Sequence, residues 1–498
     1  MNSSAFITLE NISKQFPGVL ALDRVSLTLN KGEVHCLAGQ NGCGKSTIIK
    51  VISGVYQPEK GARILIDGKL FHQLTPSLSA HYGIQVIYQD LSLFPNFSVA
   101  ENIAIHRYQP GGDLWVRRRA MRQQALAAMQ RIGVSLDPDK KVEKLSIADR
   151  QLVAICRAIA ADARLVIMDE PTASLTRQEV NGLLRVVNEL KAAGICVVFV
   201  SHRLDEVMEV ADRISVMRDG KLVGTWPASE LDSHELAFLM TGQRFHYSPL
   251  PSYVGTTALP RLALRHLTRR GKYHDISLAL HPGEIVSIVG LLGAGRTELC
   301  LSLFGMTRPD SGEIDIDGQR VTLNDNRDAI RHGIGYVSED RLTQGLIMDQ
   351  SIYDNTIVTV FDQLHTRAGL LDHRRADALV QRLIRELNIK VADSTLPVKT
   401  LSGGNAQRIA IAKWVATQPR ILILDSPTVG VDIANKEGIY QIARDLAQQG
   451  MAVLMICDEI PEAYYNSHRI LVMRRGELVA EFLPQHCSEH DIAEVVNA

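Results

Sequence analysis

The sequence is poor in aromatic residues, in long apolar runs and in net charge. Only 5% of the 498 residues are aromatic although 46% are hydrophobic, so aliphatic side chains must form the cores, as in parallel α/β sheets. The longest apolar runs, such as residues 197–200, are strand-sized and far shorter than the ~18 residues that a membrane span requires. A formal net charge of −1 gives no indication of a nucleic-acid surface.

Cysteine is also scarce, and no C-x-x-C pair occurs. The seven cysteines are odd in number and scattered, and Cys36, Cys156 and Cys196 lie inside apolar segments. We therefore expect reduced cytosolic thiols that serve as small core residues. The first ten residues carry no basic region and no cleavage site, so we expect no signal peptide.

The most informative stretch is residues 39–47, which reads G-x-x-x-x-G-K-[ST]. An apolar run precedes it and a helical pattern follows it, which is the strand–loop–helix context of a phosphate-binding loop. Backbone N–H groups and the helix N-terminus would face the phosphates. Lys45 is expected to reach the β- and γ-phosphates, and Ser46 to ligate Mg²⁺. The pattern predicts a nucleoside triphosphate site containing Gly39, Asn41, Gly42, Gly44, Lys45, Ser46 and Thr47.

Acidic residues end a second apolar strand, at 166–169. Asp169 is expected to hold the Mg²⁺ shell. Glu170 follows at the carboxyl end of the strand, where a carboxylate can align the attacking water. Gln89, after a strand at 84–88, is expected to touch the metal and the water.

Two further residues are assigned from their positions. His202 follows the strand at 197–201, a position that favours a role in sensing the γ-phosphate, although a lone histidine at a strand end is usually a surface residue. Phe16, which precedes Pro17-Gly18, is a weak candidate to stack on adenine.

The chain is a doubled unit. Residues 165–172 recur at 421–428 with an offset of 256 (425 − 169), whereas the glycines that begin the two phosphate loops differ by 251 (290 − 39). We predict a first domain at 1–242, a proline-containing linker at 243–260 and a second domain at 261–498.

Each predicted domain opens with alternating strands, such as residues 6–12 and 25–29, before strand–helix alternation begins. A segment at about 90–145 has a helical pattern without obvious strands, so we predict a helical insert there and a second insert at about 340–400. Arg117, Arg118 and Arg119 lie beside the first helical pattern and are interpreted as a solvated face.

At these residues the chain resembles the ATP-binding cassette superfamily, twice over. Lys45, Gln89, Asp169, Glu170 and His202 match its phosphate loop, Q-loop, acidic strand and switch histidine. Residues 401–405, Leu-Ser-Gly-Gly-Asn, match its signature loop. The resemblance implies two tandem P-loop nucleotide-binding domains, each a RecA-like α/β core with an antiparallel β subdomain and a helical insert. It also implies ATP and Mg²⁺ as ligands.

In that superfamily, cassettes meet head to tail, so that one phosphate loop faces the signature of the other cassette. The resemblance therefore implies a first site that includes Ser402, Gly403 and Gly404, which open an apolar helical pattern. The second site would face Leu145-Ser-Ile-Ala-Asp149, where Ile147 and Ala148 replace the signature glycines.

The second site also departs from the catalytic pattern within its own cassette. Arg296, Glu339, Ser426 and Asp458 stand where lysine, glutamine, glutamate and histidine are expected, and Gly271 replaces the phenylalanine. Because the departures fall on one site, we predict one hydrolytic site and one degenerate site. The degenerate site comprises Gly290, Gly295, Arg296, Thr297, Asp425, Ser426 and Asp458.

The second phosphate loop, Gly290 to Glu298, and Ser338-Glu-Asp-Arg341 resemble the twin-cassette ATPases of bacterial monosaccharide importers. The resemblance implies a peripheral protein on the cytoplasmic face of the inner membrane. Its partners would be a permease, in two copies, and an extracytoplasmic solute-binding protein, without nucleic acid. A nucleoside-importer ATPase is an alternative, and a soluble translation or repair ATPase is less favoured because the linker is brief and nearly neutral.

Overall fold

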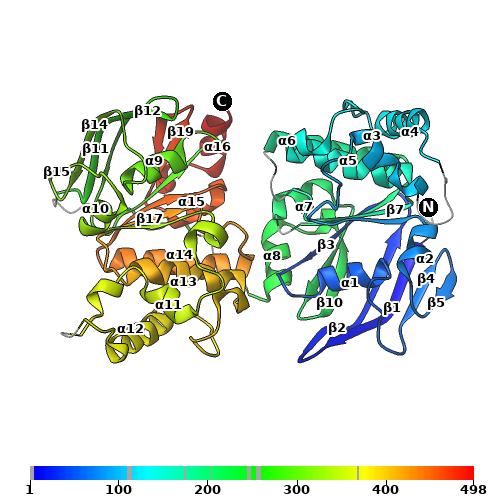
Figure 1. Ribbon diagram of the computed structural model, residues 1–498, viewed down its shortest axis with the longest axis horizontal. Coiled ribbons are helices and arrows are strands. Elements are labelled where there is room, and N and C mark those ends of the chain that lie inside the picture. Colours follow the sequence, from blue (N-terminus) through cyan, green and yellow to red (C-terminus); the bar gives the residue numbers. More distant parts are fainter. Residues whose placement is uncertain are drawn as a thin grey trace. The chain divides into compact units, whose positions relative to one another are not determined.

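The computed structural model describes residues 5–108, 115–172, 175, 177–201, 203–243, 248–253, 259–366 and 369–498. The chain divides into two compact units, Met1–Phe245 and His246–Ala498, each with its own sheets and helices (Figure 1). His202 lies outside the described residues, as do residues 244–247 and 254–258 of the expected linker. Within the second unit, Tyr253 of the linker segment donates a hydrogen bond to the Pro282 carbonyl at 2.8 Å.

The central sheet of the first unit has the order β10-β9-β3-β8-β7-β6, parallel except for β10. Its strands β3 and β8 are buried along their whole length, which explains their apolar sequences, interrupted in β3 by His35. A second, antiparallel sheet has the order β2-β1-β4-β5. The strand bounds are β1 Ala5–Phe16, β2 Val19–Asn30, β3 Val34–Gly39, β4 Arg63–Ile66, β5 Lys69–Phe71, β6 Ile84–Ile87, β7 Leu165–Asp169, β8 Cys196–Val200, β9 Arg213–Arg218 and β10 Lys221–Pro227.

Helices connect these strands and cover the central sheet. The segment between β6 and β7 is helical, and Ser98 begins α3 with a capping box that includes Glu101. The bounds are α1 Lys45–Ile52, α2 Pro76–His81, α3 Val99–Ala104, η1 Ile105–Tyr108, α4 Arg118–Arg131, η2 Val142–Lys144, α5 Ile147–Ala160, α6 Arg177–Ala192, α7 Leu204–Val210, η3 Ala228–Glu230 and α8 Ser233–Thr241.

The second unit repeats this topology. Its central sheet has the order β16-β17-β18-β13-β19-β20, parallel except for β20, and its antiparallel sheet has the order β12-β11-β14-β15. The strand bounds are β11 Leu262–Arg269, β12 Tyr273–Leu280, β13 Ile285–Val289, β14 Ser311–Ile316, β15 Gln319–Val321, β16 Ile334–Val337, β17 Ile421–Asp425, β18 Ala452–Ile456, β19 Arg469–Arg474 and β20 Glu477–Phe482.

The helices of the second unit pack on both faces of its central sheet, where separate apolar cores form. The predicted α/β architecture of two tandem units is confirmed. Among the described residues, no helix combines the length and the apolar character needed to cross a bilayer. The bounds are α9 Arg296–Leu303, α10 Asn326–Arg331, η4 Arg341–Gly345, α11 Ile352–Ile357, η5 Phe361–Gln363, α12 His373–Glu386, η6 Val398–Thr400, α13 Gly403–Val415, α14 Ile433–Gln448, α15 Ile460–Asn466, η7 Pro484–His486 and α16 Glu489–Asn497.

Candidate functional site

The phosphate loop of the first unit joins β3 to α1. Gly44 caps α1 with a φ of 106°, and a Cβ there would lie 2.6 Å from the Ala21 carbonyl oxygen, so this position requires glycine. Asn41, Gly42 and Ser46 are exposed at the loop surface. The predicted residues lie together at this junction: Gly39, Asn41, Gly42, Gly44, Lys45, Ser46 and Thr47.

Lys45 is folded back into this loop. Its ammonium donates to the carbonyl oxygens of Gly39 at 2.7 Å and Gln40 at 2.8 Å, and the residue is only 6% exposed. Both acceptors are neutral, so these bonds leave the positive charge available to a phosphate.

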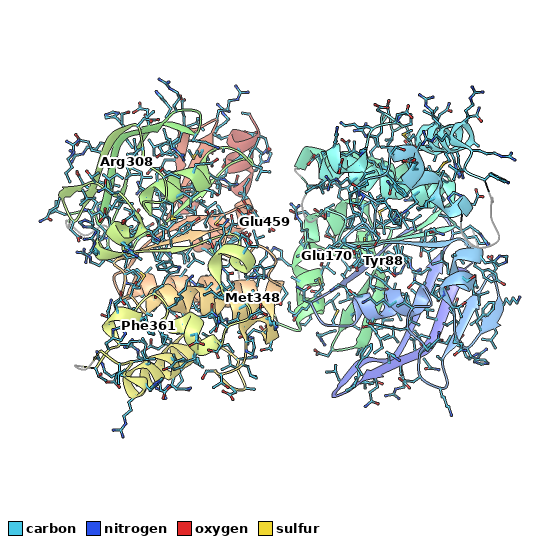
Figure 2. All side chains as sticks on the ribbon, in the orientation of Figure 1. Tyr88, Glu170, Arg308, Met348, Phe361 and Glu459 are labelled. Atoms are coloured by element: carbon cyan, nitrogen blue, oxygen red, sulfur yellow. The ribbon has the colours of Figure 1, made fainter. Side chains whose placement is uncertain are left out.

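The acidic end of β7 lies in the same unit. Burial raises the pKa of Asp169, the neighbouring Glu170 raises it further, and Lys45 opposes the rise. Glu170 has a φ of 51° and its N–H donates to the Val200 carbonyl at 2.9 Å, which fixes the turn after the strand. Figure 2 labels Glu170 and also Tyr88, which immediately precedes the exposed Gln89 at the end of β6.

Glu206, which the sequence analysis did not single out, connects the two loops that flank this turn. Its fully buried carboxylate accepts hydrogen bonds from Thr172 and from Ser201, the latter at 2.9 Å, and pairs with Arg203 at 2.9 Å. Ser201 and Arg203 flank His202 in the sequence. The internal repeat could have identified Glu206, because glutamate recurs at 462 with the offset of 256 (462 − 206).

Phe16, at the end of β1, is half-buried. Its ring packs edge-on against Tyr56, with 5.3 Å between the ring centroids, and Lys14 lies 5.6 Å from its centroid. These contacts hold the aromatic ring in place, and no described contact tests its predicted role with adenine.

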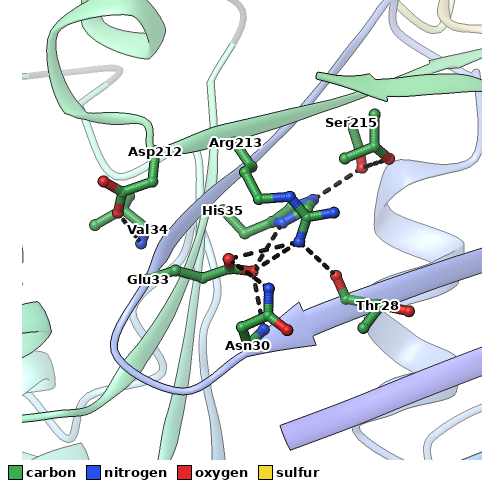
Figure 3. Close-up of polar contacts among 9 residues, drawn as sticks. Thr28, Asn30, Glu33, Val34, His35, Asp212, Arg213 and Ser215 are labelled. Atoms are coloured by element: carbon green, nitrogen blue, oxygen red, sulfur yellow. Dashed lines mark hydrogen bonds and ion pairs between the residues drawn. The ribbon is translucent and has the colours of Figure 1, made fainter. Parts of the chain in front are cut away.

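A polar network supports the strand that leads into the first phosphate loop (Figure 3). His35 is fully buried in β3, where its ring contacts Glu33 at 3.2 Å and Ser215 at 2.8 Å. Burial lowers the pKa of His35, against the pull of Glu33. Although burial opposes it, hydrogen bonds from His35 and Asn30 lower the pKa of Glu33 to about 2. The Glu33 carboxylate, which is charged at neutral pH, therefore supports β3 through its contact with His35.

The second unit builds the same loop around arginine. Gly290 directly follows β13, and Gly295 caps α9 with a φ of 101°. Arg296 donates to the Cys457 carbonyl at 2.7 Å and pairs with Asp458 at 3.0 Å. The charge of Arg296 is therefore neutralised by a carboxylate, whereas the ammonium of Lys45 donates to neutral carbonyl oxygens.

The carboxylate at the end of β17 in the second unit is also hydrogen-bonded by residues of the same unit. The buried Asp425 carboxylate accepts hydrogen bonds from Tyr336 at 2.7 Å and from Thr297 at 3.2 Å. Burial raises the pKa of Asp425 to about 6, although both hydrogen bonds lower it. Ser426 keeps the backbone turn of Glu170, with a φ of 42° and an N–H bond to the Ile456 carbonyl at 3.2 Å.

The two signature segments differ in what they expose. Gly403 and Gly404 begin α13, and a Cβ at Gly404 would lie 2.5 Å from the Asn435 Cβ. Ser402 is exposed and its hydroxyl accepts from the Asn405 amide at 3.0 Å. In the first unit, Ile147 begins α5 and is 52% exposed, so a branched apolar side chain covers the corresponding helix start.

A family model described as ABC transporter matches residues 22–173 and 273–429. The chain is 38% identical over 502 residues to a putative ribose/galactose/methyl galactoside import ATP-binding protein of Geobacillus kaustophilus, covering 99% of this chain and 98% of that protein. It is 41% identical over 490 residues to a ribose import ATP-binding protein of Streptomyces avermitilis, covering 98% and 96% of the two chains.

A likeness to one solved structure extends over most of the chain. The crystal structure of an archaeal ribosomal stalk protein with an archaeal ribosome recycling factor contains a chain with a TM-score of 0.60 and 18% identity, and the match covers 94% of this chain and 88% of that one. At this identity the likeness shows the fold alone.

Proposed function

This chain belongs to the ABC transporter family of ATP-binding proteins, and from that premise we propose that it is the ATP-hydrolysing subunit of an importer for a monosaccharide or a related small solute. The names of the relatives support this proposal, since those proteins are import ATP-binding proteins for ribose or galactose. ATP hydrolysis would drive closing and reopening of the cassettes, and a separate permease would convert that motion into transport.

A single observation supports unequal pockets. Glu170 and Ser426 occupy the same backbone turn after equivalent strands, with positive φ values of 51° and 42°, but only Glu170 carries a carboxylate. A carboxylate in that position can align and polarise the attacking water, whereas a serine hydroxyl cannot accept its proton at neutral pH. Hydrolysis is therefore assigned to the pocket of the first unit, together with Gln89 and His202.

The first pocket has donors that suit Mg²⁺. The exposed hydroxyl of Ser46 and the carboxylate of Asp169 are oxygen ligands, and Gln89 can supply a third oxygen. Mg²⁺ would neutralise the developing phosphate charge. Lys45 would turn from its carbonyl partners toward the phosphates, and Ser402, Gly403 and Gly404 would complete this pocket.

The partners follow from the same proposal. The chain would bind two permease subunits at the cytoplasmic face of the membrane, and an extracytoplasmic solute-binding protein would deliver the substrate. Isolating the binding protein that co-purifies with the transporter and screening it against monosaccharides tests this assignment. A bound monosaccharide is expected, and a binding protein that takes only nucleosides would contradict it.

The unequal pockets are tested by substituting the turn residues. We expect Glu170→Gln to lower the ATPase rate of the full chain about 10²–10⁴-fold, because the aligning carboxylate is lost. The matched control, Ser426→Ala, should stay close to wild type. A Glu170→Gln variant that retained hydrolysis would overturn the assignment.

A further inference from the structure

The helix α4 of the first unit belongs to a strongly basic segment. From Trp115 to Arg131 the sequence contains five arginines and no acidic residue. The equivalent segment of the second unit, residues 370–386, contains four arginines and three acidic residues. With histidine neutral, the formal charges of the two segments are therefore +5 (5 − 0) and +1 (4 − 3), although the segments hold the same helix of the repeat.

The equivalence of α4 and α12 is shown by their buried faces. In α4 the buried residues include Met121, Ala125 and Ala128. In α12 the residues 255 positions later are buried: Ala376, Val380 and Leu383. This face packs each helix into its own unit, and α4 lies beside α3 and α5 (Figure 1). The side chains of residues 115–119, at the start of α4, are exposed. We call these five residues the basic tip.

The first turn of α4 departs from the usual chemistry of a helix start. Arg117 is the N-cap residue, its side chain makes no capping hydrogen bond, and no acidic residue lies in the first turn. Cations at this end of a helix face the positive end of its dipole. In the second unit the equivalent residue (372 − 117 = 255) is Asp372, whose side chain accepts from the Arg375 N–H at 3.2 Å. The first unit thus forgoes the stability of an aspartate cap, and such a local conflict is typical of functional positions.

Large apolar side chains lie beside the arginines of the basic tip. Trp115 is 78% exposed and Val116 is 68% exposed. Val116 also borders a surface hollow together with the three arginines at 117–119. The other two tryptophans, Trp226 and Trp414, are partly buried. The tip therefore presents an exposed indole and several guanidinium groups on one short stretch of chain.

Acidic side chains near α4 offset part of this charge. Arg122 pairs with Asp139 at 3.3 Å. Hydrogen bonds from Ser98 lower the pKa of Glu101, and the charge of Arg118 contributes to the same shift, so Arg118 lies within electrostatic reach of Glu101. These two acids do not balance the five arginines of the segment.

We propose that the basic tip is a docking surface for the anionic headgroups of a lipid bilayer. Arginine donates several N–H groups to phosphate oxygens, and a tryptophan suits the boundary between headgroups and acyl chains. The tip has one aromatic ring rather than a series of rings on which bases could stack, which favours lipid over single-stranded RNA. The inference rests on the proposed function in one respect, since that function places the chain at the cytoplasmic face of a membrane.

Binding of the full chain to lipid vesicles, without ATP and without a permease, tests the proposal. Vesicles of neutral phosphatidylcholine are compared with vesicles that also contain anionic phosphatidylglycerol. We expect binding to the anionic vesicles alone, weakened by added salt because the attraction between exposed charges is screened. The fluorescence of Trp115 should shift to shorter wavelength on binding, and Trp115→Phe should abolish that shift.

Charge-neutralising variants measure the contribution of the arginines. We expect Arg117→Gln, Arg118→Gln and Arg119→Gln each to weaken binding to the anionic vesicles about fivefold, and the triple variant to weaken it about 100-fold. The matched control is a triple glutamine variant with the same change in net charge on the surface of the second unit, at Arg320, Arg327 and Arg331. The control should bind within about twofold of wild type, because its arginines lie outside the tip.

Arg117→Asp separates binding from folding, because it introduces the residue that caps α12. We expect its thermal midpoint to rise while its binding to anionic vesicles falls at least about fivefold. Wild-type binding by Arg117→Asp or by the tip triple variant would overturn the proposal. Equal binding to neutral vesicles, or binding to single-stranded RNA in preference to the anionic vesicles, would also overturn it. A nucleoside-specific binding protein would contradict the sugar-import assignment without changing vesicle binding, so the two failures are distinguishable.

Discussion

The two phosphate loops have similar backbone geometry and differ in the partners of their basic side chains. Lys45 in the first loop bonds to neutral carbonyls, whereas Arg296 in the second loop pairs with Asp458 at 3.0 Å. Asp425 is likewise held by Tyr336 and Thr297 inside its own unit. A phosphate entering the second loop must therefore compete with the Asp458 carboxylate for Arg296, whereas the described partners of the Lys45 ammonium include the neutral carbonyl oxygens of Gly39 and Gln40.

The comparison shows that the second loop keeps its backbone geometry although the charged residues around it differ from those of the first loop. Gly290 and Gly295 preserve the loop geometry, and Ser426 preserves the turn of Glu170. Ser426 lacks the carboxylate of Glu170, although the backbone turn is retained.

The buried glutamates of the two units offer the largest effect on stability by which to sharpen this comparison. Glu206 bonds to Thr172, two residues after Glu170 in the sequence, and to Ser201, which precedes His202. Glu462 bonds to Thr428 at 3.0 Å and pairs with Lys436 at 2.8 Å. We expect both Glu206→Gln and Glu462→Gln to destabilise the protein by about 3 kcal/mol, because each removes the buried carboxylate that pairs with a cation, Arg203 in the first unit and Lys436 in the second. Only Glu206→Gln should also lower the ATPase rate per folded molecule, about tenfold.

Thermal unfolding and ATPase rates corrected for the folded fraction check this pair. Lys436→Met in the Glu462→Gln background is the rescue control, because it removes the charge that the first substitution leaves behind. Equal losses of activity in the two glutamate variants would contradict the division of roles between the units.

The sequence predicted the doubled architecture and both loops because those features depend on local patterns. Strand periodicity, loop glycines and the repeat offset are all readable without knowing which strands pair. The hydrogen bond from Tyr336 to Asp425 was not predictable in this way. It requires β16 to lie beside β17, with Tyr336 opposite Ile423, across 89 residues of chain.

Arg341 illustrates the same limit. Its motif was recognisable, but its bonding partners are carbonyl oxygens of Val429 and Gly430, and backbone acceptors leave no residue-type signal in a sequence. Glu206 was recoverable in principle, since glutamate and threonine both recur with the offset of 256 (462 − 206 and 428 − 172). Its burial between two loops was the part that only the fold reveals.

The smaller expected effect is a difference in pH dependence between the units. The folded pKa of Asp425 is about 6, above the ordinary value of 3.8, so its contribution to stability is fully present below about pH 4 and is lost as the pH rises through 6. Glu33, with a pKa of about 2 against an ordinary 4.5, behaves oppositely: its contribution is present above pH 4.5 and is lost as the pH falls toward 2.

Thermal midpoints measured from pH 3 to pH 7.5 should separate the two groups. Asp425→Asn should remove a decline in stability between pH 4 and 7 of at most about 3 kcal/mol, whereas Glu33→Gln should flatten the acid side alone. In Tyr336→Phe the decline should extend to higher pH, because the lost hydrogen bond had favoured the charged carboxylate. Curves for Asp425→Asn and wild type that ran parallel from pH 4 to 7 would mean that Asp425 does not hold a proton up to about pH 6. The internal neutralisation of the second pocket would then depend on the pair of Arg296 and Asp458.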